Sequence, residues 1–153
     1  MNLRAVNKLA AVWISGAAFA LAAGMAQAND TPASLEGATV VTADQAKELQ
    51  AKGATMVDAR VANEYADAHI KGAINIPYKE KSGKSADFDA SQDSWDMSKL
   101  PHDKNANIIL SCNGPECWKS YKSAKMAVKA GYKHVYWFRG GYPEWKSKGF
   151  PTE

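Results

Sequence analysis

The sequence has few cysteine and histidine residues, and its charged residues form no block of one sign. Only 2 of its 153 residues are cysteine and 3 are histidine. Two cysteines limit the chain to one internal disulfide, and no histidine is placed in sequence as the base of a Cys–His pair. The 19 Lys and Arg and the 16 Asp and Glu form no block of one sign, which excludes a nucleic-acid footprint and a polybasic membrane patch. Internal repeats are also absent.

Long apolar runs are missing everywhere except at the amino terminus. There, Arg4 and Lys8 flank the start of an alanine-rich apolar core over residues 9–23, and Ala26-Gln27-Ala28 has the small-residue pattern of a cleavage site. The core is short for a membrane span, although an uncleaved anchor is the alternative. We predict a secretory signal peptide that is cut after Ala28.

Cleavage divides the chain into residues 1–28 as signal peptide, 29–37 as a flexible tether and 38–153 as one folded domain. The signal peptide carries two of the 19 basic residues and none of the 16 acidic ones, so the mature net charge is +1. We expect a periplasmic or secreted protein without a membrane anchor. Such a compartment is oxidising, so the two cysteines raise the question of a disulfide.

Strands and helices alternate along the mature chain. Short β-branched and aromatic runs predict strands over residues 39–41, 55–57, 73–76, 107–111 and 135–138. Helical periodicity and capping residues predict helices that end near residue 52, over 63–69 and 118–130, and after Gly140. The lysines of the 118–130 helix are expected to face solvent, and residues 78–100 to form a polar excursion over the surface. This order predicts an α/β fold, a five-stranded parallel sheet with helices on both faces.

Residues that could take part in catalysis or ligand binding follow three of the predicted strands: Asp58-Ala59-Arg60, Cys112 and Arg139-Gly140-Gly141. Parallel strands end at one edge of a sheet, where such folds bind ligands, so we expect these residues to meet there. Cys112 precedes a Gly-Pro turn and the amino end of a predicted helix. Backbone N–H groups and the helix dipole stabilise an anion at that position, so we predict a reactive thiolate.

The residues resemble those of rhodanese-like domains. The resemblance rests on Val57-Asp58-Ala59-Arg60, Glu64-Tyr65, residues 69–77, Cys112, Gly131-Tyr132, Val135, Gly140-Gly141, Trp145 and Gly149-Phe150-Pro151. It covers nearly all of the mature chain. It implies the five-stranded parallel sheet, and a cysteine, Cys112, that accepts sulfane sulfur as a persulfide and passes it to a thiol acceptor. The resemblance implies no metal and no organic cofactor.

The active-site loop departs from the family pattern. It comprises Asn113, Gly114, Pro115, Glu116 and Cys117, followed by Trp118 and Lys119. Family members that use thiosulfate tend to carry a basic residue here, whereas Glu116 opposes a second anion and Lys119 is the nearest basic residue. We also expect a loop longer than the usual six residues. Asp58 and Arg60 are expected to brace the rim of the loop, and Arg139 to offer positive charge to an anionic donor.

Cys117 has three open roles: a packing residue, a resolving thiol, or the disulfide partner of Cys112. The leading hypothesis is an exported sulfurtransferase that uses Cys112, a small sulfur donor and a thiol acceptor. The alternatives are a thiol–disulfide redox protein that uses Cys112 and Cys117 with a thioredoxin-like reductant, and a binding module without turnover.

Overall fold

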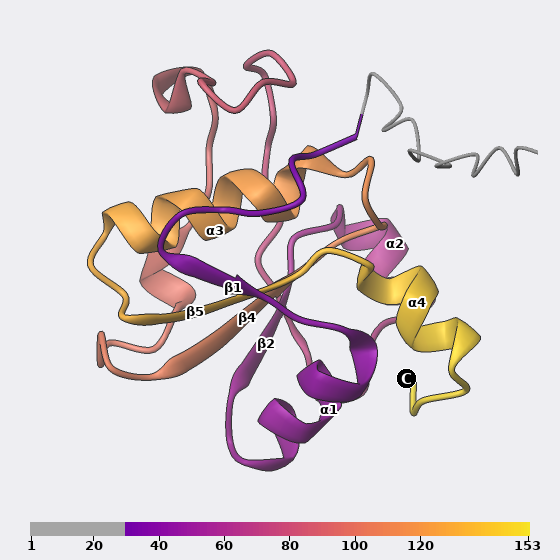
Figure 1. Cartoon of the computed structure of the whole chain (residues 1–153). Coiled ribbons are helices and arrows are strands. Elements are labelled where there is room, and N and C mark those ends of the chain that lie inside the picture. Colours follow the sequence, from indigo (N-terminus) through magenta and orange to yellow (C-terminus); the bar gives the residue numbers. More distant parts are fainter. Residues whose placement is uncertain (1–29) are drawn as a thin grey trace, which may run out of the picture.

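The computed structural model describes residues 30–153, so the predicted signal peptide and its cleavage site lie outside the described residues. Figure 1 shows a twisted sheet with helices on both of its faces. In chain order the elements are β1 (Ala38–Val40), α1 (Ala43–Ala51), β2 (Thr55–Asp58), α2 (Ala62–Asp67), β3 (Ile74–Asn75), the 3-10 turns η1 (Ala90–Gln92) and η2 (Met97–Lys99), β4 (Asn107–Ser111), α3 (Trp118–Lys129), β5 (His134–Phe138) and α4 (Gly141–Ser147).

The five strands form one parallel sheet in the order β1-β5-β4-β2-β3, which confirms the predicted α/β fold. The central strand β4 shows why the run Ile108-Ile109-Leu110 is continuously apolar. Ile108 and Leu110 pack in the layer that contains α3, while Ile109 packs in the layer that contains α1 and α4. Both faces of the strand are covered, so neither tolerates a polar side chain.

Residues 31–37, predicted to be a flexible tether, are instead packed against the domain. Thr31 is 2% exposed, and Leu35 belongs to the buried cluster beneath α3. Thr31 donates its backbone N–H to the carbonyl of Pro115 over 2.9 Å, which places this segment on the active-site loop. The composition of this segment is typical of a linker. Its packing was not predicted, because the residues that it contacts lie far away in the sequence.

The excursion over residues 78–100 holds the two 3-10 turns and is anchored by apolar side chains. Trp95 is buried and donates its indole N–H to the carbonyl of Ile76 over 3.1 Å. Phe88 and Met97 pack against the same core cluster. The excursion rises beside α3 in Figure 1 and reaches the region of the active-site loop.

One prediction about α3 is wrong, because Lys122 does not face solvent. Its side chain is 0% exposed, and the excursion covers it. The ammonium group lies 2.8 Å from Glu80 Oε2 and donates to Ser82 Oγ over 2.8 Å. A buried ammonium group requires such partners, because desolvation without them is costly.

Candidate active site

Cys112 lies directly after the last residue of β4, at the carboxyl edge of the sheet. Only six residues, 112–117, separate β4 from α3, so the expectation of a longer loop is wrong. The residues that follow, up to Lys129, belong to α3. Cys112 is 1% exposed, and its carbonyl accepts a hydrogen bond of 2.8 Å from the backbone N–H of Tyr142 at the start of α4.

The two cysteines are joined in a disulfide, so Cys117 is the bonded partner of Cys112 in this structure. Their Cα atoms are 6.2 Å apart, within the range that a disulfide needs. The loop turns back on itself at Gly114, whose φ of 110° favours glycine, and the N–H of Cys117 donates to the Gly114 carbonyl over 3.0 Å. This turn brings the start of α3 back to the end of β4.

Gly141 allows the close contact between α4 and the loop. Its φ is 60°, and a Cβ atom at this position would clash with the carbonyl of Cys112. Glycine at 141 is thus required twice, by backbone conformation and by space. The predicted meeting of the Gly140-Gly141 pair with Cys112 at one rim is confirmed.

Asp58 and Arg60 form a buried ion pair at the carboxyl end of β2. Arg60 Nη2 lies 2.6 Å from Asp58 Oδ2, and Arg60 Nε is 3.0 Å from both carboxylate oxygens. The guanidinium also donates to the carbonyl of Ala68 over 2.9 Å and stacks on the ring of Tyr142 at 4.3 Å. Arg60 therefore ties the end of β2 to α4 and to the residue after α2, rather than facing a substrate.

Arg139 was predicted to offer positive charge to an anionic donor, but its guanidinium group is hydrogen-bonded to Thr31. Its Nη2 donates to the carbonyl of Thr31 over 2.8 Å and its Nε donates to Thr31 Oγ1 over 3.1 Å. Thr31 Oγ1 in turn donates to the carbonyl of Pro115 over 2.7 Å. These bonds hold Arg139 on the amino-terminal segment, so it supports the loop through Thr31 instead of offering its charge to a donor.

A cavity of about 240 Å³ opens beside Cys117. It is lined by Glu80, Lys84, Asn113, Glu116, Cys117, Trp118 and Lys119. Glu80 and Lys84 come from the excursion over residues 78–100, and sequence reasoning missed them because only tertiary packing brings them to the loop. A second cavity, of about 400 Å³, adjoins it through the shared residues Glu80 and Lys119 and includes the exposed Val61.

The charges around the first cavity are only partly paired. Glu80 is paired with Lys122, and its Oε2 accepts no well-directed hydrogen bond within the described residues, so this ion pair alone balances its charge. Asn113 donates to Glu64 of α2 over 2.7 Å, which fixes the start of the loop. Lys84, Lys119 and Glu116 have no ion pair within residues 30–153. The cavity therefore presents two ammonium groups and one carboxylate to a bound molecule.

A buried polar network adjoins this cavity through the ion pair of Lys122 with Glu80. Burial alone would raise the pKa of Asp93, but hydrogen bonds from the side chain and N–H of Ser82, the N–H of Lys81 and the hydroxyl of Tyr78 more than offset it and hold that pKa well below its usual range. Burial and the hydrogen bond to Asp93 raise the pKa of Tyr78. Lys122 reaches the same network through Ser82, so α3 and the excursion share it.

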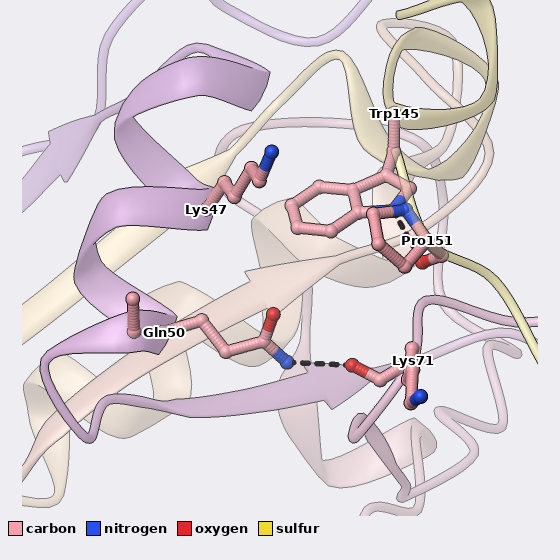
Figure 2. A pocket seen from close by; sticks show the side chains of 6 residues that line it. Lys47, Gln50, Lys71, Trp145 and Pro151 are labelled. Carbon is pink, nitrogen blue, oxygen red and sulfur yellow. Dashed lines mark hydrogen bonds between the residues drawn. The ribbon is translucent and has the colours of Figure 1, made fainter. Parts of the chain in front are cut away.

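The surface also has a hollow away from the active-site loop. Figure 2 shows a hollow of about 230 Å³ between α1 and α4, lined by Lys47, Gln50, Ala51, Lys71, Trp145 and Pro151. None of its residues belongs to the loop. Within residues 30–153 no three His, Cys, Asp or Glu side chains are placed to hold a metal ion, and no helix has the length and apolarity to span a membrane.

Known proteins share the sequence pattern and this arrangement of elements. The sequence profile described as "Rhodanese-like domain" matches residues 42–148. The chain is 27% identical over 129 residues to thiosulfate sulfurtransferase 16, chloroplastic, of Arabidopsis thaliana, across 84% of this chain and 99% of that protein. It is 28% identical over 132 residues to rhodanese-like domain-containing protein 17 of the same plant, across 80% of this chain and 79% of that protein.

Two solved structures share the fold. The Alr3790 protein from Anabaena sp. is 27% identical to this chain with a TM-score of 0.54, across 74% of this chain and 90% of that one. The thiosulfate sulfurtransferase from Pseudomonas aeruginosa is 21% identical with a TM-score of 0.56, across 76% of this chain and 20% of that one, and at that identity it supports the fold alone. With a family profile that spans α1 to α4, and a cysteine at the end of the central strand, the chain belongs to the rhodanese-like domain family.

Proposed function

We propose that the protein is an exported sulfurtransferase that moves sulfane sulfur through a persulfide on Cys112. The observation that carries the proposal is the place of Cys112, at the end of β4 and facing the amino end of the 12-residue helix α3. Free N–H groups and the helix dipole at that end stabilise a thiolate, which is the nucleophilic form of cysteine. Membership of the family and the resemblance to a thiosulfate sulfurtransferase support the same chemistry.

The reaction has two steps. The Cys112 thiolate attacks the outer sulfur of a donor, a sulfur–sulfur bond forms on Cys112, and the donor's own bond breaks with its electron pair leaving on the departing group. A thiophilic acceptor then takes the outer sulfur of the persulfide and returns Cys112 to the thiolate. We expect loop N–H groups to stabilise the negative charge in both steps.

The disulfide adds a requirement to this cycle. While Cys112 is bonded to Cys117, its sulfur is uncharged and shares an electron pair in the S–S bond, so it is not a thiolate nucleophile. We therefore expect the oxidised chain to accept no sulfur from a donor until a two-electron reductant has opened the loop.

The charged side chains that line the cavity affect which sulfur donors can bind there. Glu116 disfavours a dianion such as thiosulfate, whereas Lys84 and Lys119 favour it. A donor that carries a single charge, such as a small organic persulfide, avoids most of the conflict. We propose that the donor is of this kind.

Two cysteine variants test the proposal. After reduction, the mature chain is exposed to thiosulfate and to cysteine persulfide, and the sulfur bound to protein is measured by cyanolysis and intact mass. Cys117→Ser should gain one sulfur atom, and Cys112→Ser should gain none. If Cys112→Ser is loaded as well as Cys117→Ser, Cys112 is not the sulfur carrier.

The disulfide also favours a second candidate, thiol–disulfide exchange without sulfur transfer. In that case reduction of a disulfide substrate should require both cysteines, and neither variant should carry cyanolysable sulfur. A binding module without turnover would show neither activity.

Export is proposed from residues 1–28 of the sequence. Expression of the full chain in a bacterium, followed by fractionation and amino-terminal sequencing, tests it. The expected product begins at Asn29 and is found in the periplasm or the medium, whereas a cytoplasmic chain that retains Met1 would refute export.

A further inference from the structure

The disulfide joins one buried sulfur to one that solvent can reach. Cys112 is 1% exposed, whereas Cys117 is partly exposed and lines the cavity of about 240 Å³. In the oxidised chain, a thiolate from outside can therefore approach the sulfur of Cys117 and not that of Cys112. Attack at Cys117 expels Cys112 as a thiolate at the site where the end of β4 meets the amino end of α3. A well-stabilised thiolate is a good leaving group, so the two halves of the disulfide have different roles.

We propose that Cys117 is a resolving thiol that releases the sulfur carried by Cys112 as hydrosulfide. This inference rests on the proposed function, because it begins with a persulfide on Cys112. The thiolate of Cys117 attacks the inner sulfur of that persulfide, and a bond forms between the two cysteine sulfurs. The bond between Cys112 and the outer sulfur breaks, and the outer sulfur leaves with the electron pair and its own proton as hydrosulfide. The protein product is the disulfide found in the structure.

The loop is built for this step. The Cα atoms of the two cysteines are 6.2 Å apart, and the turn at Gly114 is closed by the N–H of Cys117. On the other side, Thr31 holds Pro115 through both its N–H and its hydroxyl. With both sides of the loop held, the side chains of Cys112 and Cys117 stay within bonding reach without a rearrangement of β4 or α3.

A dithiol closes the cycle through the exposed sulfur. One of its thiolates attacks Cys117 and releases Cys112, which leaves a mixed disulfide on Cys117. The second thiol of the same molecule attacks that mixed disulfide, releases Cys117 and departs as its own disulfide. Two electrons thus pass from the dithiol to the sulfane sulfur. Lys84 and Lys119, which line the cavity beside Cys117, are placed to stabilise the incoming thiolate.

A single turnover without free reductant tests the inference. The mature chain is reduced, freed of reductant and mixed with an equal amount of cysteine persulfide or thiosulfate. Hydrosulfide is trapped with a bimane reagent, and the protein is quenched in acid for intact mass. The wild type should release one hydrosulfide per chain and lose two hydrogen atoms. Cys117→Ser should gain one sulfur atom and release hydrosulfide only after dithiothreitol is added.

The outcomes separate this inference from the function on which it rests. If the wild type keeps the extra sulfur while Cys117 remains open to alkylation, Cys117 does not resolve the persulfide and only the inference falls. The same holds if Cys117→Ser releases hydrosulfide as fast as the wild type without added thiol. If Cys117→Ser and Cys117→Ala, both folded by circular dichroism, gain no sulfur from either donor, the proposed function falls too.

Discussion

Reducing the Cys112–Cys117 disulfide should leave the domain folded. The cysteines are only five positions apart in sequence, and the chain entropy that a cross-link removes from the unfolded state grows only with the logarithm of loop length. For a loop of this size the relation gives about 2 kcal/mol at 25 °C. An ordinary domain has a free energy of unfolding of about 5–15 kcal/mol, so most of the stability should remain after reduction.

Urea unfolding of the oxidised and the reduced chain measures this difference. Circular dichroism and tryptophan fluorescence should report the same transition, with a midpoint lower by about 1 M in the reduced protein if the slope is about 2 kcal/mol per M. The double variant Cys112→Ser/Cys117→Ser, which cannot form the bond, is the matched control and should unfold with the reduced wild type. A chain that unfolds on reduction alone would show that the disulfide is structural and would refute a cycle that opens it.

Three further predictions concern the support of the site. Lys122→Met should lower the free energy of unfolding by about 3–5 kcal/mol, because it leaves buried carboxylates without their cation, whereas Lys129→Met on the exposed side of α3 should change urea unfolding far less. The pKa of Asp93 is lowered by folding, so its contribution is present above the usual carboxylate range and is lost as the pH falls below it. Asp93→Asn should therefore make unfolding less sensitive to acid below about pH 4, and equal acid sensitivity would contradict this. Thr31→Val should cost about 1–3 kcal/mol in urea unfolding, because the carbonyl of Pro115 loses the hydroxyl that donates to it, and an unchanged midpoint would show that this bond adds nothing.

Local sequence patterns predicted the position of the active-site loop, but not the roles of two basic residues near it. Strand and turn patterns predicted that the loop follows β4, precedes the amino end of α3 and lies next to Gly141. They did not predict the roles of Arg139 and Lys122. Each is a basic side chain next to a predicted element, and a sequence assigns such a side chain to solvent unless a distant partner is known. Their partners, Thr31 and Glu80, lie far away along the chain.

The sequence by itself determined the parallel sheet and the position of Cys112 at its carboxyl edge. Those properties depend on local patterns, a continuous apolar run and then a Gly-Pro turn before a helix, which act between neighbouring residues. Only the tertiary structure decided that Cys117 bonds to Cys112, and that Lys84 and Glu80 line the adjoining cavity. The physical reason is that a disulfide requires a particular separation and direction of two side chains. A cavity wall requires segments to dock across the fold, and neither condition is encoded in the spacing of residues along the chain.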